Sequence, residues 1–143
     1  MKKSEVHHSL EKCEKAFGQL KDAVQEASDG NQLKQDGVIQ RFEFTFELLW
    51  KTLREYLAFL GKSINNPRDT LKESFREQII ADEQTFLDML EDRNLSTHSY
   101  DFETTRRIFG HIQSKYVEAM QALLAELKKR ISFPETPTGK EPQ

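Results

Sequence analysis

Four residues in one short stretch of the sequence could act together on a phosphate group: Arg93, Asn94, His98 and Tyr100. Arginine supplies a planar cation with several N–H donors, which suits a phosphodiester. Histidine can accept or donate a proton near neutral pH, and the amide and the phenol can add hydrogen bonds. These residue types fit either the binding of a nucleotide or a proton transfer at a phosphodiester bond.

The helix predicted just before this stretch should position the arginine and the amide. Its apolar residues continue at intervals of three and four to Arg93 and Asn94, where such a pattern buries its side chains. A buried guanidinium is costly without a partner, so we expect another group to pair with Arg93. After a turn, His98 and Tyr100 are expected at the start of the next helix, where free backbone N–H groups favour anions.

The rest of the sequence is organised as helices. Apolar residues recur at alternating intervals of three and four in three segments, which predicts long helices over residues 10–27, 39–60 and 101–131. Two shorter helices are expected between the last two, the first beginning with Asn66 and Pro67 and the second capped by Asp82. No segment alternates as a strand would. The sequence therefore predicts an all-α, up-and-down antiparallel bundle of three long and two shorter helices.

One domain accounts for nearly all of the 143 residues. The bundle is assigned to residues 1–131. Residues 132–143 contain three of the chain's four prolines among polar side chains, and we expect this tail to be disordered.

Composition narrows the function classes. The longest apolar run has five residues, from Tyr56 to Leu60, whereas a membrane-spanning helix needs about 20. A single cysteine and no signal peptide predict a cytoplasmic protein. A net charge of −3 argues against non-specific coating of nucleic acid, although it leaves room for one small basic site. There is no glycine-rich phosphate loop and no metal-ligand spacing, so we expect neither cofactor nor metal.

Other candidate groups have plainer interpretations. Glu43 and Glu47 are expected to lie on a solvated helix face, and Cys13 in the core. Arg106 and His111 repeat the spacing of Arg93 and His98, but within one helix residues five apart diverge by about 140°. We therefore do not assign that pair to a site. Arg106 and Arg107 could extend a positive rim, although a solvated helix face is the more common explanation.

The segment over residues 39–60 is apolar over much of its circumference, with Phe44, Phe46 and Trp50 on different sides. Such a helix is either central in a bundle or presents a second face to a partner. Both interpretations stay open here.

In three stretches the sequence resembles the nucleotidyltransferase substrate-binding protein family of the HEPN superfamily. These are residues 41–53 (RFEFTFELLWKTL), 67–75 (PRDTLKESF) and 93–101 (RNLSTHSYD). With their order and spacing they cover nearly the whole chain before the tail. The resemblance implies a HEPN-like bundle that forms a homodimer and works with a separately encoded minimal nucleotidyltransferase.

Related HEPN toxins cut RNA without metal through an Arg-x4-His-x-Tyr motif, whose tyrosine the partner enzyme adenylylates. By resemblance, this motif falls on Arg93, His98 and Tyr100. Three hypotheses follow. The chain is a non-catalytic subunit that binds a nucleotide or RNA at these residues. Alternatively, it is a ribonuclease toxin with Arg93, Asn94 and His98 as catalytic residues, silenced at Tyr100. In the third, Arg93, Asn94 and His98 merely fix a helix end.

Overall fold

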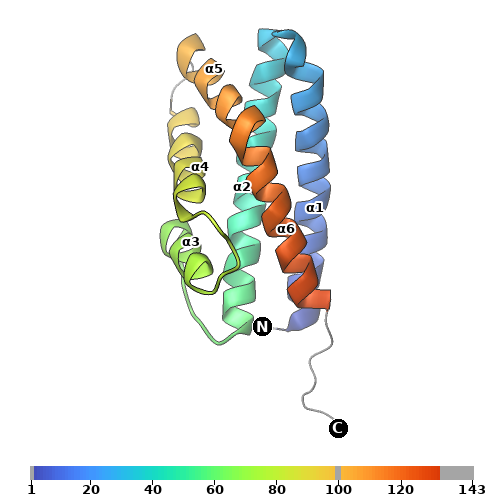
Figure 1. Ribbon diagram of the computed structural model, residues 1–143, viewed down its shortest axis with the longest axis vertical. Helices are drawn as coiled ribbons and strands as arrows, with labels where there is room; N and C mark the ends of the chain where they lie inside the picture. Colours follow the sequence, from blue (N-terminus) through green and yellow to red (C-terminus); the bar gives the residue numbers. More distant parts are fainter. Residues whose placement is uncertain (1, 99–100, 133–143) are drawn as a thin grey trace.

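The computed structural model describes residues 2–98 and 101–132, which form helices and turns without a strand. The long helices α1 and α2 run antiparallel and are joined by the short helix η1. Helices α3 and α4 lie one above the other along one side of α2, and the last helical run returns across α1 and α2 (Figure 1). The bounds are α1 (Lys3–Glu26), η1 (Ala27–Asp29), α2 (Gln32–Phe59), α3 (Pro67–Arg76), α4 (Glu83–Ser96), α5 (Phe102–His111), η2 (Ile112–Tyr116) and α6 (Val117–Ser132). The predicted all-α bundle is confirmed.

Local signals set the helix ends. The side chains of Asn66, Asp82 and Asp101 each accept a hydrogen bond from a backbone N–H in the first turn of the helix that follows. Helix α2 ends in a Schellman turn, in which Gly61 has φ +92° and the Lys62 N–H donates to the Leu57 carbonyl at 2.8 Å. Glycine reaches this conformation without the cost that a Cβ would impose.

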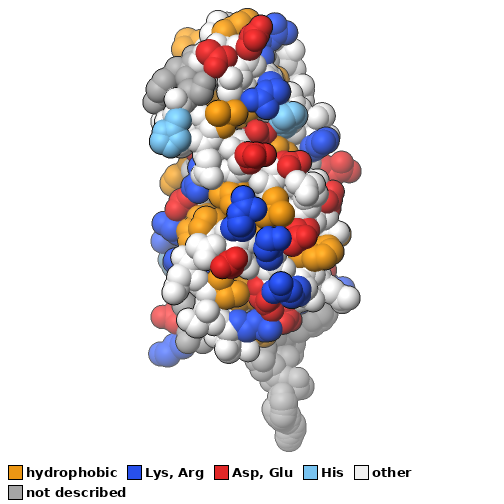
Figure 2. Space-filling view, turned by 90° about the vertical axis from the view of Figure 1, so that its left-hand side faces the viewer, with side chains coloured by type: hydrophobic (Ala, Val, Ile, Leu, Met, Phe, Trp, Pro, Cys, Tyr) orange, Lys and Arg blue, Asp and Glu red, His pale blue; other side chains and the backbone are white. Residues whose placement is uncertain are grey.

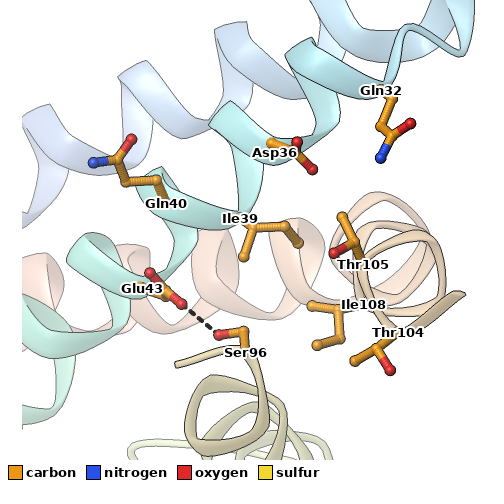
Figure 3. Close-up of a pocket in the computed structure, with 9 residues that line it drawn as sticks. All are labelled: Gln32, Asp36, Ile39, Gln40, Glu43, Ser96, Thr104, Thr105 and Ile108. Carbon is orange, nitrogen blue, oxygen red and sulfur yellow. Dashed lines mark hydrogen bonds between the residues drawn. The ribbon is translucent and has the colours of Figure 1, made fainter. Parts of the chain in front are cut away.

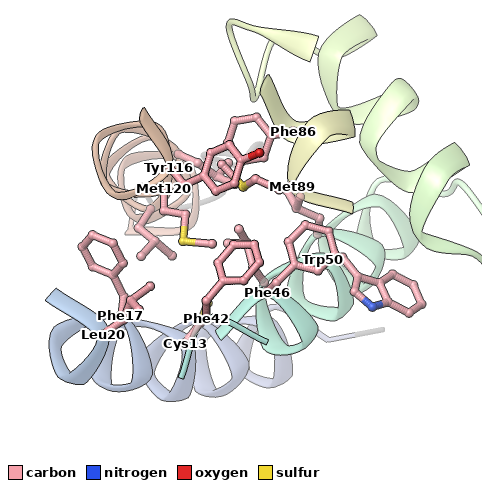
Figure 4. Close-up of a cluster of buried hydrophobic side chains, with 14 of the residues drawn as sticks. Cys13, Phe17, Leu20, Phe42, Phe46, Trp50, Phe86, Met89, Tyr116 and Met120 are labelled. Carbon is pink, nitrogen blue, oxygen red and sulfur yellow. The ribbon is translucent and has the colours of Figure 1, made fainter. Parts of the chain in front are cut away.

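Helix α2 is the central element of the bundle. It packs against α1, α3, α4 and α5, and it buries Phe42, Phe46 and Trp50 in a continuous core (Figure 4). Cys13 on α1 is fully buried in the same core, as expected. The high apolar content of α2 therefore reflects its central position, except at Leu33 and Phe44, which are 80% and 59% exposed.

The last helical run is not a uniform α-helix. One π-helical turn, η2, separates α5 from α6 within the segment that the sequence predicts as a single helix from Asp101. Across this turn, His111 and Tyr116 both contact Asp92 of α4. Among the described residues, no helix is long and apolar enough to cross a membrane.

Candidate functional site

Arg93 lies on α4 with its side chain turned toward α2. Its Nη1 donates to the Glu47 carboxylate, and the guanidinium lies over the Phe46 ring, 5.5 Å from the ring centroid. Its Nε donates to Asn94 Oδ1 at 3.1 Å. The side chain is only 19% exposed. The expectation that a partner would pair with a partly buried Arg93 is therefore correct, and that partner is Glu47.

The two carboxylates of α2 that were expected on a solvated face contact α4 instead. Glu47 binds Arg93 and also Lys51, 3.2 Å from its Nζ. Glu43 accepts a hydrogen bond from Ser96 Oγ at 2.5 Å. Partial burial tends to raise the pKa of Glu47, but Lys51, Trp50 and Arg93 together hold it below its ordinary value. The interpretation as a solvated face is wrong because α4 packs against this side of α2.

Asn94 corrects a second expectation, since its side chain is exposed rather than buried. The apolar stripe of α4 turns away from Asn94 in the last turn, where Asp92 and Ser96 are buried instead. Asn94 still contributes to the site, because its amide oxygen accepts the hydrogen bond from Arg93 Nε.

His98 was predicted at the N-terminal start of a helix, but it lies at the C-terminal end of α4. Its backbone N–H donates to the Leu95 carbonyl at 3.1 Å, so it continues the C-terminal turn of α4, and α5 begins only at Phe102. The C-terminal end of a helix favours a cation, not an anion. The imidazole is exposed and makes no hydrogen bond or ion pair to other described residues. Tyr100, predicted as a binding or modification site, lies outside the described residues.

A buried carboxylate beside Arg93 was missed in the sequence. Asp92 Oδ2 accepts a hydrogen bond from Tyr116 Oη at 2.6 Å and contacts His111 Nδ1 at 2.8 Å. Because a carboxylate oxygen accepts, His111 donates to Asp92 through Nδ1. The Tyr116 ring stacks on Phe42 at 5.6 Å between centroids. Asp92 thus anchors α4 to the last helical run and to the core.

The C-terminal half of α4 is consequently held from two sides. Arg93 and Ser96 bind the carboxylates of α2, while Asp92 binds His111 and Tyr116. Arg93 is therefore fixed in place with its charge compensated, and the exposed His98 follows one turn later.

A cavity of about 380 Å³ opens beside this cluster, between α2 and α5 (Figure 3). Ser96 closes it on the side of α4, through the hydrogen bond to Glu43 that the figure marks. Its lining residues are Gln32, Asp36, Ile39, Gln40, Glu43, Ser96, Thr104, Thr105 and Ile108. None of these residues was singled out in the sequence except Glu43, because their spacing on α2 and α5 matches no known motif.

The surface next to the cluster has mixed charge. Arg106 and Arg107 line an open depression with Phe102, and the Arg106 guanidinium lies 5.4 Å from the centroid of that ring. Figure 2 shows basic and acidic side chains mingled over the side of the bundle that carries α3 and α4. Within residues 2–98 and 101–132, no three His, Cys, Asp or Glu side chains are placed to hold a metal ion.

The fold and this cluster define the class: an all-α bundle that presents an arginine, an asparagine and a histidine at one helix junction. Residues 8–129 match the family described as nucleotidyltransferase substrate binding protein like, and the chain belongs to that family. This confirms the resemblance seen in the sequence.

Two relatives extend the comparison. The chain is 29% identical over 142 residues to the probable ribonuclease HepT of Haemophilus influenzae, covering 87% of this chain and 95% of that protein. The crystal structure of ttk003001694 from Thermus thermophilus superposes with a TM-score of 0.72 at 29% identity, covering 85% of this chain and 99% of the other.

Proposed function

We propose that this protein is a cytoplasmic, non-catalytic binding subunit that forms a homodimer and pairs with a separately encoded minimal nucleotidyltransferase. Its site, formed by Arg93, His98 and Tyr100, would receive a nucleotide or a segment of RNA. The observation that carries this proposal is the environment of Arg93, which is mostly buried and already neutralised by Glu47. An arginine held this way can position a ligand, but it has little free charge with which to stabilise a reacting phosphate.

An exposed apolar surface on α2 supports the proposed dimer. Leu33 and Phe44 are 80% and 59% exposed. They lie eleven residues apart on α2, which places them on the same helix face. Phe46 and Trp50 pack inside this chain, so Leu33 and Phe44 are the large apolar side chains of α2 that stay exposed to a second copy.

Light scattering of the purified protein tests the dimer. The wild-type chain is expected to have the mass of a dimer at micromolar concentration, and Phe44→Glu to have that of a monomer. Phe75→Glu is the matched control, since Phe75 is 42% exposed but lies on α3 and not on α2. A wild-type monomer, or a dimer that survives Phe44→Glu, would contradict the proposed interface.

Co-expression with a minimal nucleotidyltransferase tests the pairing. The two chains are expected to co-purify, and the purified protein should bind adenosine monophosphate in calorimetry. Arg93→Ala is expected to weaken that binding by at least about tenfold, because a hydrogen bond to a charged group contributes about 1.5–3 kcal/mol. Unchanged affinity in Arg93→Ala would refute the role of this site.

A metal-independent ribonuclease toxin is the second candidate, and the exposed His98 beside a fixed Arg93 favours it. His98 would remove the proton from a ribose 2′-hydroxyl, which attacks phosphorus while the bond to the 5′ oxygen breaks. Arg93 would stabilise the phosphorane, with Asn94 holding the guanidinium in position. Adenylylation of Tyr100 would place a phosphate beside the site and exclude RNA.

Expression in a bacterial host separates the two candidates. A ribonuclease should arrest growth and degrade cellular RNA in the wild type but not in His98→Ala, and chelation of divalent metals should not protect the RNA in vitro. If wild type and His98→Ala leave RNA equally intact, the toxin hypothesis fails. Mass spectrometry after co-expression with the nucleotidyltransferase would show whether Tyr100 gains adenylate.

A further inference from the structure

The cavity between α2 and α5 presents polar side chains that the fold itself does not use. Gln32, Asp36 and Gln40 follow one another at intervals of four along α2, so they lie on one helix face. None of the three side chains makes a hydrogen bond or ion pair to another residue within the described ranges. Gln32 and Asp36 point toward α5 in Figure 3 and are available to a ligand there, whereas the Gln40 amide points away from α5.

The opposite wall combines hydroxyl and apolar groups. Thr104, Thr105 and Ile108 come from α5, and Ile39 of α2 lies across from them (Figure 3). Thr104 Oγ1 is used by Asp101, whereas the Thr105 hydroxyl has no partner among the residues described. Ile39 and Ile108 are 9% and 0% exposed, so they form an apolar floor that continues into the core.

The charge of the lining decides which part of a nucleotide fits. Asp36 and Glu43 are carboxylates, and none of the described residues that line the cavity is Lys, Arg or His, so a phosphate would be repelled. Carboxylates accept hydrogen bonds from an exocyclic amino group, and a glutamine amide can both donate to and accept from the edge of adenine. A volume of 380 Å³ is at the small end of ligand pockets, which run from about 300 to 1,000 Å³. One nucleobase with its ribose fits these features better than a larger ligand.

We infer that this cavity binds the amino-bearing base of a nucleotide, adenine or cytosine in preference to uracil, while the phosphate lies toward Arg93 and His98. Ser96 lines the cavity and lies three residues after Arg93 on α4, so the cavity adjoins the last turn of that helix. The inference rests on the proposed nucleotide site and adds the part of the ligand that it recognises.

Binding of free nucleosides tests the cavity without any phosphate. By calorimetry or saturation-transfer NMR, adenosine is expected to bind at least fivefold more tightly than uridine, since a well-paired base edge contributes about 1–3 kcal/mol of discrimination. Gln32→Ala and Asp36→Ala should each remove most of that preference. Both residues are exposed on α2, so their substitution is not expected to prevent folding. Gln113→Ala, an exposed glutamine outside the cavity, is the matched control.

The outcomes separate this inference from the proposed function. Equal binding of adenosine and uridine, or a preference that survives both cavity variants, overturns the base site. If the cavity variants fail in this way but Arg93→Ala still weakens the binding of adenosine monophosphate, the proposed nucleotide site itself stands. Conversely, adenosine discrimination with no effect of Arg93→Ala on the monophosphate supports the cavity and refutes the phosphate site. Spermidine is tested in the same binding series, because the carboxylates of the cavity could attract a polyamine. If spermidine binds and neither nucleoside does, the inference is overturned.

Discussion

The hydrogen bond from Tyr116 to Asp92 provides a direct test of how α4 is held. We expect Tyr116→Phe to lower stability by more than the loss of an ordinary hydroxyl would, because the Tyr116 hydroxyl donates at 2.6 Å to a carboxylate that is only 6% exposed. Burial first, and then Asp92, raise the pKa of Tyr116 well above its ordinary value. The hydroxyl therefore stays protonated and remains a donor throughout the usual pH range.

The size of the stability loss in Tyr116→Phe depends on the hydrogen bond that the buried Asp92 loses. Phenylalanine fills the same space against Phe42, so the change creates almost no void, but the buried Asp92 keeps only His111 as a side-chain donor. Hydrogen bonds to charged groups contribute about 1.5–3 kcal/mol. For a chain of this length, about 4 °C of melting temperature corresponds to 1 kcal/mol, so we expect a fall of roughly 6–12 °C.

Urea unfolding followed by circular dichroism gives the free energy, and hydrogen exchange gives the location of the effect. Tyr56→Phe is the matched control, because Tyr56 is also buried but its hydroxyl interacts with Arg130 rather than with a buried carboxylate. We expect its cost to be only about 0.5–1.5 kcal/mol, because the Arg130 side chain is 25% exposed and keeps Glu126 and the Gln78 carbonyl as acceptors. Exchange in the last turn of α4 should increase in Tyr116→Phe alone. Equal losses in the two variants would refute the claim that Asp92 anchors α4.

Three further changes test other parts of the molecule. Glu47→Gln should reduce the loss of stability between pH 7 and pH 3 in urea unfolding: a pKa lowered below its ordinary value of 4.5 contributes stability above that value, which is lost as the pH falls through the folded-state pKa. Burial, and then Glu14, raise the pKa of Cys13 to about 12, so the native thiol should resist iodoacetamide and react only in denaturant. Gly61→Ala should cost about 1–2 kcal/mol because of its positive φ, whereas Gly18→Ala within α1, with no neighbour in the way, should stabilise by about 0.5–1 kcal/mol in the same assay.

The sequence predicted the fold well because the signals for these helices are local. Asn66, Asp82 and Asp101 cap the helices that follow them, and Gly61 ends α2, each through contacts within a few residues along the chain. The apolar intervals of three and four describe a single helix face and need no knowledge of the partner helix. Such features can be predicted without the rest of the structure.

The site could be predicted only in part, because its contacts join distant residues. Arg93 was recognised, yet its partner Glu47 lies 46 positions away, and the apolar pattern of α2 gave no sign that α4 would cover that carboxylate. His98 was expected at the wrong helix end because α4 continues through Ser96 and its last turn includes Thr97 and His98. The length of a helix beyond its apolar residues depends on what the final turn packs against.

Residue pairs five apart in the sequence could not be placed from local periodicity alone. In a regular α-helix such residues diverge, which is why Arg106 and His111 were set aside. His111 and Tyr116 have the same spacing, but they bracket the π-helical turn η2, whose hydrogen bonds join residues five apart. Both side chains therefore reach the same oxygen of Asp92. A regular α-helix would direct only one of them toward α4 and leave the buried carboxylate one donor short, so the π turn supplies the second donor.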